Sequence, residues 1–230
     1  MDKIQVIENL FNFTFQYSFL LPICIFLLFY KQIRSQKVCW VIFTYSILFF
    51  LLNYFFHSIP RDYKPAYYTI YTLLEYSSFA SILWLQIENK SFKKFVVIFS
   101  SFFFLFAIIY SLTNKWKFLD SVPIGVETIL IFIFISLVFY EQLRNAKNQY
   151  VYNSSWFWLI IGIMIYLAGS FFFYILVNNI DKKIVSNYWF ITYIFDTLKN
   201  ISFCIAILVL IRNRKKNSQS SSTIPYLDMI

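Results

Sequence analysis

Four ionisable side chains interrupt otherwise apolar stretches of this chain, and they are its best candidates for chemistry. Glu75 and Glu127 each lie in one such stretch, and Asp196 and Lys199 lie together in another. A charge at the centre of a bilayer costs at least about 2.5 kcal/mol on insertion scales, so residues of this kind face the interior of a helix bundle and have partners there. Three acids and one amine suit the binding of a small ligand or cation, or the relay of a proton.

The stretches that carry these residues have the length and composition of membrane-spanning helices. Of the 230 residues, 60% are hydrophobic and only 13% are charged, which excludes an ordinary water-soluble domain. Because a helix needs about 20 apolar residues to cross the hydrocarbon core, we expect an all-α integral membrane protein, a seven-transmembrane-helix bundle. The predicted spans are 12–30, 38–56, 66–87, 95–112, 120–140, 156–177 and 188–211.

Short segments flank the predicted bundle of residues 12–211. Residues 1–11 precede it, and residues 212–230 form a short basic, Ser-rich tail that we expect to be disordered. Lys and Arg are retained on the cytoplasmic side of short loops, and they are more numerous on the face that carries the C-terminal end. We therefore expect the N-terminus outside and the C-terminus in the cytoplasm.

The three acids are predicted to share one level of the bundle. Their spans all start at the outer face, and each acid lies roughly eight residues, or about 12 Å, inside its span. Lys199 lies one helical turn from Asp196, so the two side chains can pair. Other polar residues at comparable heights complete a predicted pocket in the outer half: Tyr71, Ser78, Tyr166, Ser170 and Asn200. The alternative is that these groups only join helices by hydrogen bonds.

The sequence lacks the residue patterns of several other classes of site. Cys24, Cys39 and Cys204 have no metal-ligand spacing and there is a single histidine, so we expect no metal site, no disulfide framework and no cofactor. The sequence contains no HExxH, GxSxG, Walker or Rossmann pattern. The net charge of +9 comes from short basic clusters between apolar runs, so we expect the lipid bilayer and not nucleic acid as a partner.

Four stretches resemble a known group of membrane proteins. They are YTIYTLLEYSSF, PIGVETILIFIFISLVFYEQLR, SSWFWLIIGIMIYLAGSFFFYIL and NYWFITYIFDTLKNISFCIAI. These are similar to bacterial seven-helix membrane modules that are often fused or linked to histidine kinases, and in that resemblance Glu75 and Glu127 match recurrent acidic positions. The resemblance implies a sensory role and a location in a bacterial cytoplasmic (inner) membrane. No kinase, regulator or DNA-binding domain follows the last span, so we expect such a protein to signal through a cytoplasmic partner.

Three functions fit this sequence, and a non-enzymatic one is favoured. The first is a receptor-like or signalling-associated protein that binds a small ligand or cation in the outer-half pocket. The second is a proton- or cation-coupled transporter, but it needs polar groups in the inner half, where Ile, Leu and Phe dominate. The third is a membrane-embedded enzyme acting on lipid, with Glu75 and Glu127 as acid and base. A retinal photoreceptor built on Lys199 is a narrow variant of the first.

Overall fold

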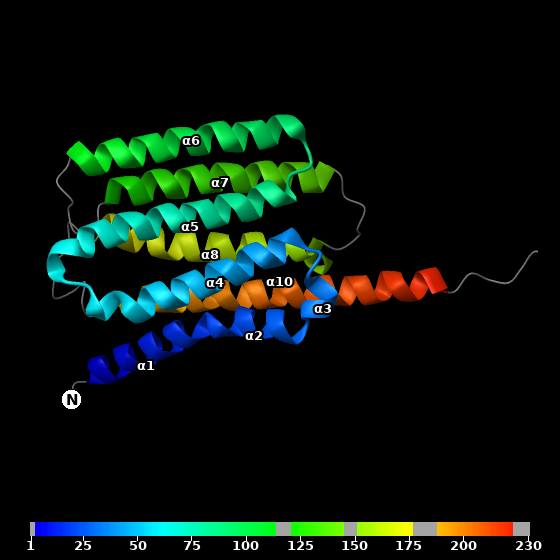
Figure 1. The fold of residues 1–230 in the computed structure, drawn as a ribbon, viewed down its shortest axis with the longest axis horizontal. Coiled ribbons are helices and arrows are strands. Elements are labelled where there is room, and N and C mark those ends of the chain that lie inside the picture. Colours follow the sequence, from blue (N-terminus) through cyan, green and yellow to red (C-terminus); the bar gives the residue numbers. More distant parts are fainter. Residues whose placement is uncertain (1–2, 114–120, 145–150, 177–187, 223–230) are drawn as a thin grey trace, which may run out of the picture.

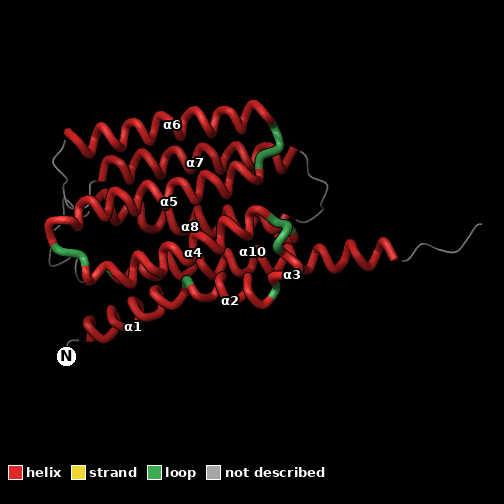
Figure 2. Tube along the Cα trace, viewed as in Figure 1, coloured by secondary structure: helices red, strands yellow, loops and turns green. Residues whose placement is uncertain are grey.

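Apolar helices account for the regular structure of this chain. The computed structural model describes residues 3–113, 121–144, 151–176 and 188–222, and within these ranges it contains helices and short connections but no strand (Figure 2). The ends of two predicted spans, at residues 120 and 177, and the tail residues 223–230 lie outside the described residues. Within the described ranges, the expectation of an all-α protein is confirmed.

Each predicted span contains a helix, and the helices lie side by side as a bundle (Figure 1). The helices are α1 (Lys3–Ser18), α2 (Leu20–Leu28), α3 (Tyr30–Ile33), α4 (Lys37–Phe55), α5 (Lys64–Gln86), α6 (Lys90–Thr113), α7 (Ser121–Arg144), α8 (Ser155–Leu176) and α10 (Phe190–Ser222). The short 3-10 turns are η1 (Phe56–Ser58), η2 (Arg61–Tyr63) and η3 (Val151–Asn153).

Five of these helical stretches are long and apolar enough to cross a membrane. They are Glu8–Leu28, Lys37–Phe55, Lys90–Thr113, Val122–Arg144 and Phe190–Lys215. The chain is thus an all-α protein with five candidate membrane-spanning helices among its described residues. Helix α5 is as long as these but carries Thr, Ser, Tyr and Glu side chains that lower its hydropathy. It packs against α4, α6, α7 and α8, so much of its surface meets protein and not lipid.

In the first predicted span, 12–30, the helical hydrogen bonding is interrupted, although Phe19 at the interruption keeps α-helical dihedral angles. Helix α1 ends at Ser18 and α2 starts at Leu20. The cause is Pro22, because proline has no N–H to donate to the carbonyl four residues earlier and its ring crowds that carbonyl. The carbonyl concerned belongs to Ser18. In addition, α1 begins at Lys3, inside the segment 1–11 that we expected to precede the bundle.

The closest approach between two helices is that of α8 and α10. A β-carbon placed on Gly169 would lie 2.3 Å from ring carbons of Phe195, and one placed on Gly162 would lie 2.7 Å from the β-carbon of Ser202. Because glycine has no side chain at these two points, the backbones approach closely and form the most extensive helix contact of the bundle. This contact fixes α10 against α8, and both helices carry residues of the predicted pocket.

Polar contacts hold the loops at the end of the bundle opposite the N-terminus. Glu141 Oε1 accepts hydrogen bonds from the backbone N–H groups of Glu88 (2.9 Å) and Asn89 (2.7 Å), between α5 and α6. On α10, Asn213 Nδ2 donates to the carbonyl of Asn153 in η3 at 2.7 Å. Arg214 Nη1 likewise donates to the carbonyl of Gln32 in α3 at 2.7 Å. Helix α10 is therefore tied to two separate loops at this end.

Helix α10 continues beyond its predicted end at residue 211. We expected residues 212–230 to lack regular structure, whereas the helix extends to Ser222 and projects from the bundle (Figure 1). The helix at residues 212–222 differs from that expectation. Helix propagation is favourable once a nucleus exists, and the span inside the bundle supplies that nucleus. The contacts of Asn213 and Arg214 hold the first turn outside it.

Candidate functional site

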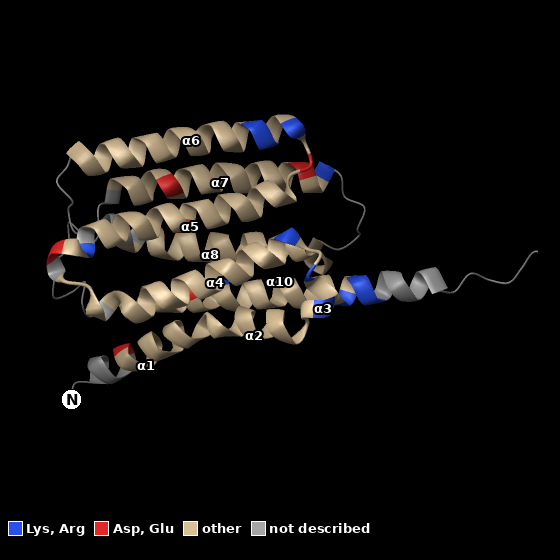
Figure 3. Cartoon of the chain, in the orientation of Figure 1, with Lys and Arg blue, Asp and Glu red and all other residues tan. Residues whose placement is uncertain are grey.

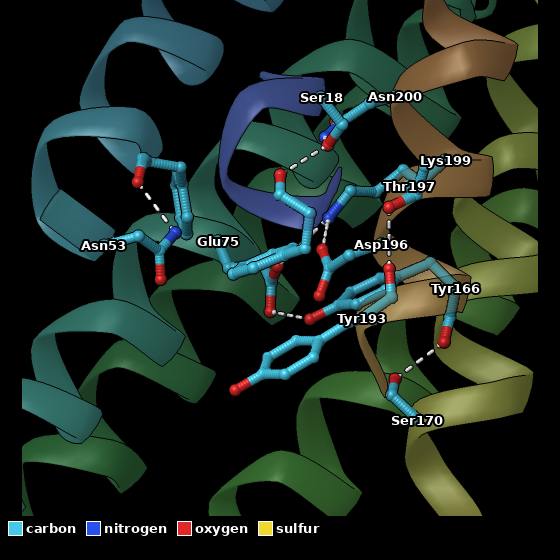
Figure 4. Close-up of polar contacts among 12 residues, drawn as sticks. Ser18, Asn53, Glu75, Tyr166, Ser170, Tyr193, Asp196, Thr197, Lys199 and Asn200 are labelled. Atoms are coloured by element: carbon cyan, nitrogen blue, oxygen red, sulfur yellow. Dashed lines mark hydrogen bonds and ion pairs between the residues drawn. The ribbon is translucent and has the colours of Figure 1, made fainter. Parts of the chain in front are cut away.

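Lys199 is a buried cation at the centre of the bundle. Its side chain is 0% exposed, and its Nζ donates a hydrogen bond to Asp196 Oδ1 at 2.5 Å. The same Nζ lies 3.8 Å from Glu75 Oε1 on α5 and 3.7 Å from the centre of the Tyr166 ring on α8. The predicted pairing of Lys199 with Asp196 is therefore confirmed. We call Lys199, Asp196 and Glu75 the ion triad, and it joins α5 to α10 (Figure 4).

The ion triad is completed by a tyrosine from α8. Tyr166 donates its hydroxyl hydrogen to Glu75 Oε2 at 2.9 Å. Tyr166, Asp196 and Glu75 are all buried, so this hydrogen bond is made away from water, where charge-assisted hydrogen bonds are strong. Three helices that are distant in sequence thus meet around one ammonium group.

A cavity of about 190 Å³ adjoins the ion triad at the end of the bundle that contains the N-terminus. Its wall comes from one end of each of several helices: the first half of α5, α7 and α10, and the second half of α4 and α8. Six of the predicted pocket residues line it: Tyr71, Glu75, Glu127, Tyr166, Ser170 and Asp196. The volume has room for on the order of ten water molecules or a small organic ligand.

Glu127 is the acid of this cavity that the ion triad does not use. Its residue is 2% exposed and lines the cavity, and its Oε1 accepts no hydrogen bond from the described residues. It interacts electrostatically with Glu75 and Lys199. The three carboxyl groups singled out by the sequence therefore face one common space. Glu75 Oε1 also accepts no hydrogen bond from the described residues, but it faces the Lys199 ammonium at 3.8 Å, whereas Glu127 Oε1 has no such ion pair among them.

Three of the predicted pocket residues lie outside the cavity wall. Lys199 is behind the wall, in the ion triad. Ser78 donates to the carbonyl of Leu74, 2.8 Å away in its own helix, as Ser and Thr commonly do in helices. Asn200 Nδ2 donates to Ser18 Oγ at 2.7 Å, so it joins α10 to α1 (Figure 4). For Asn200 the structural alternative, a hydrogen bond between helices, describes what is observed.

Other residues of the wall did not figure among the predicted pocket residues. Thr128 and Tyr193 line the cavity, as do the aromatic side chains of Tyr67 and Trp189. Tyr193 precedes Asp196 by three positions, so helical spacing places both on one face and is a signal that could have found it. For Tyr67 and Trp189 the composition favours a location at the membrane interface, and only the tertiary arrangement shows them beside the acids.

Comparison with protein-family models, with curated proteins and with solved structures finds no match for this chain. The site is therefore interpreted from its own residues. In the described part of the chain, no group of three or more His, Cys, Asp and Glu side chains is arranged to hold a metal ion. The structure provides a cavity at one end of the bundle, with carboxylates, hydroxyls and aromatic rings in its wall, next to the buried ion triad.

Proposed function

We propose that this chain is a receptor-like membrane protein that binds a small ligand or cation in the cavity and acts through a cytoplasmic partner. The observation that carries this proposal is Glu127, a buried carboxylate with an unpartnered oxygen in the wall of the cavity. Unpaired buried polar groups are costly, so a protein that retains one beside a cavity is suited to a ligand that completes its hydrogen bonding.

The proposal includes a topology of seven spans with the N-terminus outside. Helices α5 and α8 lie beside the five candidate spans in the bundle and are the two further spans. Basic side chains of the described residues stand mostly at the end from which α10 projects (Figure 3), which supports a cytoplasmic location for that end. The cavity would then face outward across a bacterial cytoplasmic membrane, and the basic end would meet anionic lipid.

Helix α10 gives the proposal a route for the signal. It carries Asp196 beside the cavity and continues to Ser222 at the other end. Between these points, Asn213 and Arg214 bind two loops. A ligand that competes with Lys199 for Asp196 or Glu75 would shift this helix relative to α5. Because a helix moves as a rigid rod, the shift would reach the basic end and a partner bound there.

A receptor is favoured over a transporter by the residues on the inner side of the ion triad. The buried positions there are mostly apolar, among them Phe79, Ile135, Phe203 and Ile207. The buried Glu141 lies at the far end, where it accepts hydrogen bonds from the loop between α5 and α6. A proton or cation pathway needs polar groups or water along its length. The lining of the cavity comes from one end of the bundle, which favours a closed binding site over a pathway through it.

The test uses the full chain in lipid nanodiscs and a panel of small amines, alcohols, carboxylates and metal chlorides. Thermal unfolding is measured for the wild type and for Glu127→Gln. A ligand present at a hundred times its Kd stabilises the folded state by about 2.7 kcal/mol. A compound that binds should therefore raise the melting temperature of the wild type, and it should raise that of Glu127→Gln much less. Hydrogen exchange then follows residues 205–222, where binding should change protection.

Two results would overturn the proposal. One is a panel in which no compound separates the wild type from Glu127→Gln. The other is protein-dependent flux of the binding compound into proteoliposomes, which would make the chain a transporter.

A further inference from the structure

Three hydroxyl groups of the cavity wall donate their hydrogens to the protein backbone. Thr128, Ser170 and Thr192 each donate to a backbone carbonyl three or four residues earlier, at 2.8, 2.6 and 2.8 Å respectively. A hydroxyl has one hydrogen to donate and two lone pairs that accept. Toward the cavity these three side chains therefore present acceptors. Asn53, which also lines the cavity, donates one Nδ2 hydrogen to the carbonyl of Phe49 at 2.8 Å, and its Oδ1 is a further acceptor.

The charges of the wall favour the same kind of ligand. Three carboxyl groups line the cavity, and the described residues place one lysine among them. The ammonium of Lys199 lies with Asp196 and Glu75, while Glu127 has a buried oxygen that accepts nothing. An acidic wall rich in acceptors attracts a ligand that is positively charged and donates hydrogen bonds, and it repels an anion.

Aromatic rings form much of the remaining wall, including those of Tyr71, Trp189 and Tyr193. The face of an aromatic ring attracts a cation, most strongly where water is excluded. The protein uses this chemistry next to the cavity, since the Lys199 ammonium lies 3.7 Å from the centre of the Tyr166 ring and 5.3 Å from that of Tyr45. Carboxylates and ring faces thus already surround one organic ammonium group inside the bundle.

We infer that the cavity binds a small organic cation, an amine or a quaternary ammonium compound, with Glu127 as its counter-ion. This inference rests on the proposed function and names its ligand class. A divalent metal ion needs several oxygen ligands around one point, whereas Lys199 occupies the point on which Glu75 and Asp196 converge. A cavity of about 190 Å³ with aromatic walls fits a ligand of several carbon atoms better than a bare ion.

The experiment compares two probes of the same shape that differ in charge. Choline and its neutral isostere, in which carbon replaces the nitrogen, are added to the full chain in nanodiscs of neutral lipid, and thermal unfolding is measured; butylamine and calcium chloride are further probes. Choline or butylamine should raise the melting temperature in a saturable way, and the isostere and calcium should not. Glu127→Gln should weaken binding of the organic cation at least about thirtyfold, as expected when one partner of a buried charge pair is lost.

Glu141→Gln is the matched control. It makes the same substitution on the same helix at a residue that is also buried, with one unpartnered oxygen, but outside the cavity wall. It should leave the affinity for the organic cation unchanged. The comparison of choline with its isostere on the wild type needs no variant, so it decides the charge preference even if Glu127→Gln does not fold.

The outcomes separate this inference from the proposed function. If the isostere binds as well as choline, or if calcium alone stabilises the protein in a Glu127-dependent way, the organic-cation assignment is overturned while a ligand-binding cavity stands. If Glu141→Gln weakens binding as much as Glu127→Gln does, the assignment of Glu127 as counter-ion is overturned. If no compound distinguishes the wild type from Glu127→Gln, both the inference and the proposed function fail.

Discussion

Replacing Lys199 by methionine tests how the ion triad holds the bundle together. The substitution keeps the length of the side chain and removes the only cation that contacts Asp196 and Glu75 in the described residues. Removing one partner of a buried ion pair costs about 3 to 5 kcal/mol, because an uncompensated charge is left behind. We expect the lower end, about 3 kcal/mol, which is more than a hundredfold in the unfolding equilibrium.

The lower end of this range is expected because unfolding breaks only one of the two ion pairs of Lys199. By distance alone the Asp196 pair, at 2.5 Å, is about 1.5 times as strong as the Glu75 pair at 3.8 Å. However, helices persist when a membrane protein unfolds in detergent, since their backbone hydrogen bonds are satisfied internally. The pair within α10 therefore survives unfolding, and the pair between α10 and α5 is lost. The coupling energy of Lys199 with Glu75 should therefore account for most of the loss and should exceed that with Asp196.

The assay is reversible unfolding in mixed micelles with increasing sodium dodecyl sulfate, followed by tryptophan fluorescence. Double-mutant cycles combine Lys199→Met with Glu75→Gln and, separately, with Asp196→Asn. A coupling energy with Glu75 that is zero within error would refute the ion triad as a tertiary contact. A coupling energy with Asp196 larger than that with Glu75 would refute the argument from the unfolded state.

Three further substitutions test other contacts, the first two by the same titration and the third by hydrogen exchange. Gly169→Ala should lower the unfolding free energy by about 1 to 3 kcal/mol, because its β-carbon would lie 2.3 Å from the Phe195 ring on α10. Gly125→Ala is the control and should not destabilise the protein, because nothing lies within 4 Å of its β-carbon. Equal effects of the two substitutions would contradict close packing of α8 on α10. Ser18→Ala should cost about 1 to 3 kcal/mol, because it leaves a buried amide of α10 without its acceptor at 2.7 Å; a neutral result would exclude this contact. Glu141→Ala should speed hydrogen exchange of the backbone amides of Glu88 and Asn89, which donate to the Glu141 carboxylate. Unchanged exchange at these two amides would refute the contact.

Local features of the sequence predicted the helices well, and the exceptions have identifiable causes. Long apolar runs require helices in a bilayer, so the positions of the spans follow from composition. The division between α1 and α2 was missed although Pro22, which causes it, is visible in the sequence. The extension of α10 to Ser222 was also missed, because polar composition indicates disorder only where no stable helix precedes it.

Within the site, the sequence alone identified the pair of Asp196 and Lys199, since spacing of three residues places both on one face of any helix. It also indicated that buried acids would turn inward, because charge in lipid is costly. Only the tertiary structure decided that Glu75 shares Lys199 and binds Tyr166, that Asn200 binds α1, and that Glu127 is left with an unpartnered oxygen. These choices depend on helix rotations and heights, which are set by packing between segments far apart in the chain.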